Sequence, residues 1–358
     1  MKPAKRSWFS RIPGWLYRVV WLLTWPGLLA PWMEVSWLPV IQFVSPAFVF
    51  LFIGHIIALL WVIFLRRPAR WLIWILPALL ASGWVTTKDI RWADDTTPGK
   101  ASIRILSYNV GTFAYKSEKI GQIAELIRRE NPDVVTLQEF RNHRMNDSTL
   151  ALEHLAARLG MPYYRFIHLP IHIHGVVMYS RFPITEVDTL YLPREEINSG
   201  FLTTVEVPGY GPVGIGNIHL SSYHVGQLFR ENESWQERIK AFMGIAGRVL
   251  RRQQIKVDQI LDKTRRYPYP IVLTGDFNAV PHSRIVSEFN SRFQDSFMAE
   301  GSGIGWTYPV LGPLGIRIDY QFCTPEFHVL SHRIIRKRLS DHYPIVVTYT
   351  LEPVAKPE

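Results

Sequence analysis

The chain has 358 residues, of which 47% are hydrophobic and 20% are charged, and its formal net charge is +10. This composition excludes an intrinsically disordered protein, because such chains combine low hydrophobicity with a high density of charge. The single cysteine, Cys323, excludes a disulfide-stabilised scaffold and a metal cage built from thiolates. The length allows one large domain or two ordinary ones.

Positive charge and tryptophan are unevenly distributed along the chain. Residues 1–87 contain 10 of the 13 tryptophans, and their eight Lys and Arg against one acidic residue, Glu34, give a net charge of +7. Residues 88–358 therefore carry only +3. Because most of the positive charge flanks apolar segments, the basic composition is weak evidence for nucleic-acid binding by the larger part.

Apolar runs in residues 1–87 predict a transmembrane region of about three helices, at approximately 15–33, 45–65 and 70–87. The clearest span, Ala47–Leu65, has 19 residues and no formal charge, which is enough to cross a hydrocarbon core. Trp71–Thr87 is similar in length and also uncharged. Trp15–Ala30 is shorter and contains Pro26, so it could span, lie in the interface, form a re-entrant pair or act as an uncleaved signal anchor.

Basic residues in the short loops predict the orientation of these helices, because such residues stay on the cytoplasmic side. The N-terminal tail carries five Lys and Arg, the loop at 66–70 carries three, and the connection at 31–39 carries none. Three spans place both basic segments in the cytoplasm and residues 88–358 outside. We therefore predict an integral protein of the inner or plasma membrane, with a polar linker at 88–100 and an extracytoplasmic domain at 101–352.

Strand and helix patterns alternate through residues 101–352. Apolar runs of strand length occupy Ile103–Val110, Val134–Leu137, Val176–Tyr179, Thr203–Val207, Val213–Ile218, Ile271–Thr274, Ile318–Phe322 and Ile345–Thr350. Helical spacing occurs at Lys119–Glu130, Leu150–Leu159 and Ser234–Thr264. Many strands with a few helical regions predict an α/β (α+β) sandwich.

Polar side chains stand where several of these predicted strands end. They are Asn109, Glu139, Asn217, His219, Asp276, Asn278, Asp319, Asp341 and His342. Side chains placed just beyond buried strands can converge in one cleft. Carboxylate and amide oxygens without cysteine favour a hard cation, Mg²⁺ or Mn²⁺, over structural zinc.

These residues lie in six short motifs, in the order SYNV, LQE, NIHL, GDFN, RIDY and SDHYP. Together the motifs resemble those of the endonuclease/exonuclease/phosphatase superfamily, which includes pancreatic deoxyribonuclease, sphingomyelinases and inositol-polyphosphate phosphatases. The resemblance runs from about Ile103 to Leu351, and the apolar spans have no counterpart in the soluble members. It implies a four-layered αββα sandwich of the DNase-I-like type. One departure is Ala279, where many relatives have an acidic residue after GDFN.

The resemblance also implies the metal ligands. The glutamate of LQE, here Glu139, would be the principal ligand for Mg²⁺ or Mn²⁺. Asn109 would hold the metal or the scissile phosphate through its amide, and Asp341 would contribute to the same site. An anionic oxygen is suited to this position because a hard cation prefers it and can then bridge to a phosphate oxygen.

The catalytic roles come from the same resemblance. Asp276 would orient or deprotonate the attacking water, and Asn278 would help to position it. His342 would face the phosphate and handle charge or a proton, with Asp319 fixing its tautomer and raising its pKa. His219 would contact the phosphate or the leaving oxygen from the other side.

Other candidate residues have a structural interpretation as well as a functional one. Asn217 could bind substrate or could satisfy backbone groups near a strand end. Arg181 could meet phosphate or form a structural ion pair, and Trp306 could contact substrate from a loop near the site. His172 and His174 alternate on one strand face, which could ligate a metal, although a wall of the cleft is the favoured interpretation.

The sequence therefore predicts a membrane-anchored, divalent-metal-dependent phosphoesterase acting by direct attack of water. Its partners would be the lipid bilayer and a phosphoester substrate, which could be a lipid headgroup, a small phosphoester or a nucleic acid. The first two are slightly favoured, because the anchor would hold the cleft near a bilayer. The alternatives are a membrane-tethered endo- or exonuclease, and a non-catalytic binding protein with a degenerate domain.

Overall fold

The structure is a computed structural model of the chain. It describes the residue ranges 14–33, 39–64, 68–92, 102–111, 117–142, 151–168, 174–191, 199–222, 234–311 and 314–351. The chain divides into two compact units. The helical unit comprises Met1–Ile90 together with Val280–Ser287, and the sandwich unit comprises Arg91–Ala279 and Glu288–Glu358.

The described part of Met1–Ile90 contains four α-helices. They are α1 (Gly14–Leu28), α2 (Pro39–Val44), α3 (Phe48–Phe64) and α4 (Leu72–Thr86). Short 3₁₀ turns η2 (Ser45–Ala47), η3 (Ala69–Trp71) and η4 (Thr87–Asp89) adjoin them. A small apolar core forms where Phe48 and Leu51 of α3 meet Val44 and Val85, and a second forms around Ile75.

Two helical segments of this unit are long and apolar enough to cross a membrane. They are Ser45–Phe64, with 20 residues, and Ala69–Asp89, with 21. Much of their apolar surface is not buried within the protein; Phe64 is 76% exposed and Leu80 is 72% exposed. Helix α1 has 15 residues and contains Pro26. Length and composition thus support two spans, and the third span stays a prediction.

The segment Val280–Ser287 packs within the helical unit although it directly follows the GDFN motif in sequence. Its His282 is 1% exposed. The His282 Nε2 lies 3.1 Å from the carbonyl oxygen of Leu28, which can only accept, so Nε2 carries the proton and Nδ1 accepts from the Lys88 ammonium at 3.1 Å. Burial and the nearby Lys88 charge lower the pKa of His282 to about 4. This histidine therefore stays neutral and holds the segment in place.

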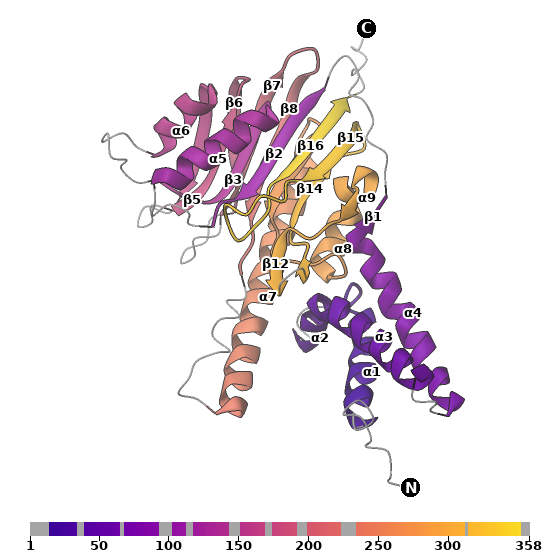
Figure 1. Ribbon diagram of the computed structural model, residues 1–358. Coiled ribbons are helices and arrows are strands. Elements are labelled where there is room, and N and C mark those ends of the chain that lie inside the picture. Colours follow the sequence, from indigo (N-terminus) through magenta and orange to yellow (C-terminus); the bar gives the residue numbers. More distant parts are fainter. Residues whose placement is uncertain are drawn as a thin grey trace. The chain divides into compact units, whose positions relative to one another are not determined.

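Two six-stranded sheets form the sandwich unit (Figure 1). The first has the order β15-β16-β2-β3-β5-β4 and the second β10-β14-β9-β8-β7-β6. The strands of the first sheet are β15 (Phe327–Ile334), β16 (Ile345–Leu351), β2 (Ile103–Asn109), β3 (Val134–Arg141), β5 (His174–Ser180) and β4 (Tyr163–His168). Those of the second are β10 (Gln294–Asp295), β14 (Asp319–Cys323), β9 (Ile271–Asp276), β8 (Gly211–His219), β7 (Gly200–Val207) and β6 (Ile184–Tyr191).

Helices cover the outer faces of the two sheets. On the first sheet, α5 (Ser117–Glu130) and α6 (Ala151–Leu159) bury one apolar core against β2 and β3 (Figure 1). The 32-residue helix α7 (Trp235–Arg266) packs beside β6 of the second sheet. The short elements of this unit are α9 (Ser296–Glu300), β11 (Gly303–Ile304), β12 (Tyr308–Leu311) and β13 (Leu314–Ile316). Two more, α8 (Arg284–Asn290) and β1 (Ile90–Arg91), begin in residues of the helical unit and end in this one.

A second apolar core fills the space between the two sheets. Ile103 and Ile105 of β2 meet Val213 and Ile215 of β8 in this layer. A few hydrogen bonds cross it, including Thr136 Oγ1 to Thr274 Oγ1 at 2.7 Å. The two-sheet α/β sandwich predicted from the sequence is confirmed, with helices on both outer faces.

Every predicted strand and helix of the large domain has a counterpart, but three long strands were missed. These are β4, β6 and β15, and each lies at the edge of a sheet. Edge strands bury fewer side chains; four consecutive residues of β6 are exposed. An apolar run is therefore a good signal for a central strand and a poor one for an edge strand.

Candidate active site

The candidate site lies where central strands of both sheets end. In the first sheet, β2 and β3 are parallel, and Asn109 pairs with Gln138, the residue before Glu139. In the second sheet, β8 and β9 are parallel, with His219 opposite Asp276. Antiparallel β14 places Asp319 opposite Asp276 from the other side. The strand register alone therefore gathers three of these groups within one sheet.

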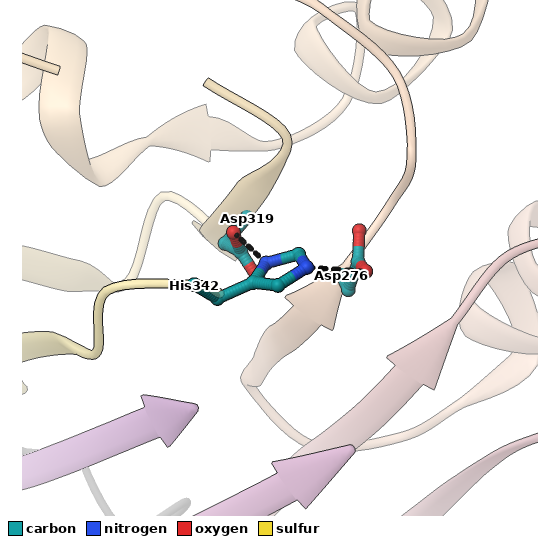
Figure 2. A group of neighbouring side chains, drawn as sticks. All are labelled: Asp276, Asp319 and His342. Carbon is teal, nitrogen blue, oxygen red and sulfur yellow. Dashed lines mark hydrogen bonds and ion pairs between the residues drawn. The ribbon is translucent and has the colours of Figure 1, made fainter. Parts of the chain in front are cut away.

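An imidazole lies between two carboxylates at the centre of the site (Figure 2). His342 Nδ1 donates to Asp319 Oδ2 at 2.9 Å, while His342 Nε2 lies 3.8 Å from Asp276 Oδ2. All three residues are buried. Because Asp319 as a carboxylate can only accept, this pairing puts a proton on Nδ1 and aims Nε2 at Asp276.

Asn109 and His219 link the carboxylate of Glu139 to this group. The Asn109 amide donates to Asp276 Oδ2 at 2.9 Å and to Glu139 Oε1 at 3.2 Å, which bridges the two sheets. His219 Nε2 lies 3.7 Å from Glu139 Oε1 and 3.8 Å from Asp276 Oδ2. Glu139, Asp276 and both histidines thus surround one small space.

The backbone is constrained at the residues that carry these groups. Glu139 has φ 54° and lies in an irregularity of β3 between Leu137 and Phe140 that redirects its side chain. Asn278 has φ 46°, and its backbone N–H donates to Asp276 Oδ1 at 2.8 Å. Positive φ is costly for residues other than glycine, and such strain clusters at functional sites.

Gly275 is required by the close approach of β9 to β8. Its φ is 134°, and a Cβ there would lie 1.9 Å from the backbone oxygen of Ile218. Only glycine fits, which explains why GDFN begins with this residue. This close approach brings the end of β9 that carries Asp276 against the end of β8 that carries His219.

Burial and neighbouring charge perturb the titration of the central groups. Burial raises the pKa of Asp276, and the charge of Asp319 raises it further. Burial alone would lower the pKa of His342, but the charges of Asp319 and Asp276 raise it overall. Burial also raises the pKa of Glu139. Such shifts are typical of sites that move protons near neutral pH.

Comparisons with known proteins identify the family of the chain. The model of the endonuclease/exonuclease/phosphatase family matches residues 106–342. The chain belongs to this family. No curated protein matches it.

Solved structures of the family share the fold at low sequence identity. An endonuclease/exonuclease/phosphatase from Beutenbergia cavernae has a TM-score of 0.52 at 23% identity, covering 70% of this chain and 72% of that one. The human Nocturnin catalytic domain with bound sulfate has a TM-score of 0.51 at 19% identity, covering 70% and 94%. TDP2 of D. rerio, complexed with a single-strand DNA product, has a TM-score of 0.52 at 16% identity, covering 70% and 100%.

The donor set fits the divalent cation that the family resemblance implies. Four carboxylates, from Glu139, Asp276, Asp319 and Asp341, lie in this cluster with the imidazoles of His219 and His342, and the charge of His174 also acts on Glu139. Ligand atoms of Asp276, Asp319 and His342 lie within 4.8 Å of one another, close enough to hold an ion. However, Asp319 and His342 bond to each other, so the Glu139 side fits the cation better. Its acidic oxygens would hold the ion, while the Asn109 NH₂ group donates to Glu139 and Asp276 and keeps these carboxylates in place.

Asp341 is held at the rim of this family site. Ser340 Oγ donates to Asp341 Oδ1 at 2.9 Å and lies 3.0 Å from the Asn109 backbone oxygen. A Cβ on Gly111 would lie 2.3 Å from Asp341 Oδ1, so glycine is needed there too. The charge of Asp341 raises the pKa of Glu139, as expected for two carboxylates that face one cation position.

The three weaker candidates are placed differently. The Asn217 amide donates to the carbonyl oxygens of Leu137 and Val177 in the opposite sheet, and its oxygen accepts from Gln138, so its polar atoms hold the sheets together. Arg181 follows β5 and pairs with Asp133 before β3, at the end of β3 remote from Glu139. Trp306 offers its backbone oxygen to Arg336. His174 is described, whereas His172 lies outside the described residues.

The structure adds two residues that the sequence interpretation missed. The ring of Tyr308 packs edge-on against His342, with centroids 5.0 Å apart. Burial and the charges of Asp341, Asp276 and Glu139 raise the pKa of Tyr308. Thr307 Oγ1 accepts from the backbone N–H of Asp319 at 3.1 Å. The loop was noticed in the sequence, but Trp306 was chosen and its two successors were not.

Proposed function

We propose that the protein is a membrane-anchored, divalent-metal-dependent phosphoesterase that hydrolyses a phosphodiester or phosphomonoester by direct attack of water. Family membership supports hydrolysis of a phosphoric ester. The membrane anchor rests on the two apolar helical segments and on the basic loops beside them. An extracytoplasmic position for the sandwich unit follows from the predicted three-span topology.

One observation carries the chemical proposal. The Asp319–His342 pair, Asp276, Asn109, Glu139 and His219 come from both sheets and face one another within hydrogen-bonding or near-contact distances. A phosphate ester repels an anionic nucleophile, so catalysis must position water and offset the oxygen charges. This set of side chains has groups for both tasks.

Each group has a role that its contacts support. Asp276 orients the attacking water and accepts its proton, and its raised pKa makes it a better base near neutral pH. His342 keeps its proton because Asp319 bonds to Nδ1, so it can stabilise charge on the phosphoryl oxygens. His219, on the other side of Asp276, serves the phosphate or the leaving oxygen. Asn278 and Asn109 fix the position of Asp276.

A divalent cation, Mg²⁺ or Mn²⁺, would supply Lewis-acid stabilisation of a phosphate oxygen when bound. Glu139 would be its principal ligand, with Asn109 and Asp341 beside it. The side chain of Glu139 is 31% exposed, and partial burial raises its pKa. This supports the assignment, because a cation would offset the cost of removing water from the charged carboxylate.

The substrate class follows from the anchor more than from the site. We favour a lipid headgroup or another small phosphoester, because the helical unit would hold the protein at a bilayer. A membrane-tethered nuclease is the alternative, supported by the fold shared with D. rerio TDP2, whose structure contains a single-strand DNA product. A net charge of +3 over residues 88–358 gives limited support for a nucleic-acid groove.

A substrate panel on the full-length protein tests this proposal. A 95–358 fragment is unsuitable, because Val280–Ser287 would lose the residues on which it packs. Full-length protein in nanodiscs with Mg²⁺ or Mn²⁺ is assayed on a generic phosphodiester, phosphatidylinositol phosphates, sphingomyelin and plasmid DNA, alongside Asp276→Ala and His342→Ala. We expect turnover of a lipid or small phosphoester that needs metal and falls in both variants. Turnover confined to DNA supports the nuclease, and no turnover on any substrate supports a non-catalytic binding protein.

A further inference from the structure

A groove runs along the helical unit between α1 and the start of α4. The hydroxyl of Tyr17 donates to the carbonyl of Trp74 at 3.4 Å, and the rings of Trp21 and Trp74 meet edge-on with centroids 5.3 Å apart. The groove has a volume of about 520 Å³. Four aromatic side chains, two aliphatic ones and two arginines, Arg18 and Arg70, line it.

The two arginines have no acidic partner in the described part of the helical unit. Arg18 and Arg70 are exposed and come from segments 52 positions apart in the sequence. The only acidic residue among the described residues of this unit is Asp89, beyond the far end of α4. At 1.5 Å per helical residue, Asp89 is about 28 Å from Arg70 along the helix. Within the described residues of the helical unit, two guanidinium groups therefore share one groove and the one carboxylate lies far from both.

The position of the groove matches the predicted cytoplasmic side of the membrane. Arg18 belongs to the basic N-terminal region and Arg70 to the basic loop at 66–70, which the charge pattern assigns to the same side. The groove brings these two segments together at the starts of α1 and α4. Anionic lipids attract positively charged segments to the cytoplasmic surface of the membrane, and tryptophan side chains are favoured in the interfacial layer of the same membrane.

We propose that this groove binds the headgroup and upper acyl chain of an anionic phospholipid. The planar guanidinium groups of Arg18 and Arg70 match the oxygens of the lipid phosphate. A second negative charge or polar group in the same headgroup would lie close to the two arginines. The walls formed by Trp21, Trp71 and Trp74 offer apolar surface for acyl methylene groups. A free phosphate or a nucleic acid would leave these walls in water. The inference rests on the proposed membrane anchor and does not involve the phosphoester site.

Lipid selectivity measured on the full-length protein tests the inference. The protein is incorporated into nanodiscs of equal phosphatidylcholine and phosphatidylglycerol, and the lipids retained after release are identified by native mass spectrometry. Each arginine near an anionic surface contributes about 1 kcal/mol of binding free energy. At 1.4 kcal/mol per tenfold change in affinity, the two together predict about 25-fold enrichment of phosphatidylglycerol. Arg18→Gln/Arg70→Gln should retain both lipids almost equally, and each single variant should lose about fivefold of the preference.

A charge-matched control separates this groove from the overall charge. Arg128→Gln/Arg129→Gln removes the same charge from the exposed face of α5 and should keep the preference. Equal retention of both lipids by the wild-type protein would overturn the inference, as would an unchanged preference in Arg18→Gln/Arg70→Gln. Protein that stays soluble without detergent and does not enter nanodiscs would overturn the membrane anchor itself, and this inference with it.

Discussion

Replacing Asp319 with asparagine removes the carboxylate that holds His342 while keeping the size of the side chain. Asp319 Oδ2 lies 2.9 Å from His342 Nδ1, and the two residues are 3% and 4% exposed. The carboxylate dictates a proton on Nδ1. An asparagine can instead present its NH₂ group, which favours the opposite tautomer and turns the wrong nitrogen toward Asp276.

The expected cost follows from the burial of the pair. Removing one partner of a buried, hydrogen-bonded ion pair costs about 3–5 kcal/mol. If about 3 kcal/mol of this is lost only in the transition state, kcat falls by about two orders of magnitude at 1.36 kcal/mol per tenfold. The charge of Asp319 also raises the pKa of His342, so the alkaline loss of activity should move to lower pH in Asp319→Asn.

The assay is steady-state hydrolysis of bis(4-nitrophenyl) phosphate by the full-length protein with saturating Mg²⁺ across a pH series. Asp188→Asn is the control, because its side chain is 56% exposed and the charge change is the same. We expect the control to match the wild-type protein. Activity of Asp319→Asn within about threefold of wild type, with an unchanged pH profile, would refute the assignment of Asp319 as the residue that orients His342.

Three further predictions concern the metal, a supporting helix and acid stability. Glu139→Gln should raise the Mg²⁺ concentration for half-maximal activity by about tenfold or more, and an unchanged metal titration would contradict the ligand assignment. Gln253 Nε2 lies 2.6 Å from the Ser221 carbonyl oxygen and 3.4 Å from that of Asn278, so Gln253→Leu should lower kcat about tenfold with little change in KM. Gln254→Leu loses only contacts to the side chains of Asp258 and Glu288, so its kcat should stay unchanged. An equal fall in kcat in both variants would argue against a role of Gln253 in supporting the site. Burial lowers the pKa of His332 to about 3, so the folded protein favours the neutral imidazole. The free energy of unfolding should therefore fall as the pH falls from about 6.5 toward 3, and the loss at pH 5 should be about 2 kcal/mol. Denaturant titrations at pH 7 and 5 check this, and a His332→Gln variant with the same acid sensitivity as wild type would contradict it.

The motif residues could be expected to lie close together because most of them stand at strand ends. Asn109, His219 and Asp276 end buried central strands and Asp319 begins one. A parallel or antiparallel register brings such positions together. Apolar runs mark these strands clearly. The order of the strands and the approach of the two sheets follow from packing and were supplied by the family resemblance.

The features that escaped prediction depend on contacts between distant segments. The direction of the Glu139 side chain is set by a strand irregularity that no local residue pattern announces. Tyr308 looks like an ordinary loop aromatic until His342 is packed against it. Arg181 was chosen for its charge, yet β5 runs antiparallel to β3 and carries it to the end remote from Glu139.

The membership of Val280–Ser287 in the helical unit was also invisible in the sequence. The segment follows GDFN and has no unusual composition. Its place depends on His282, whose two ring nitrogens bond to Leu28 and Lys88, residues about 250 and 190 positions away. Such pairings carry no periodic signal, so only the folded chain reveals them.

We propose that this cluster of side chains hydrolyses a phosphate ester with the help of a divalent cation. The most direct measurement compares the rate of phosphodiester hydrolysis by the full-length protein with Mg²⁺ and with a chelator, for the wild-type protein and Asp276→Asn in parallel. We expect turnover that needs the metal and falls by at least about a thousandfold in the variant, because the group that activates water is lost. Turnover that survives the chelator, or an Asp276→Asn variant as active as the wild-type protein, would contradict it.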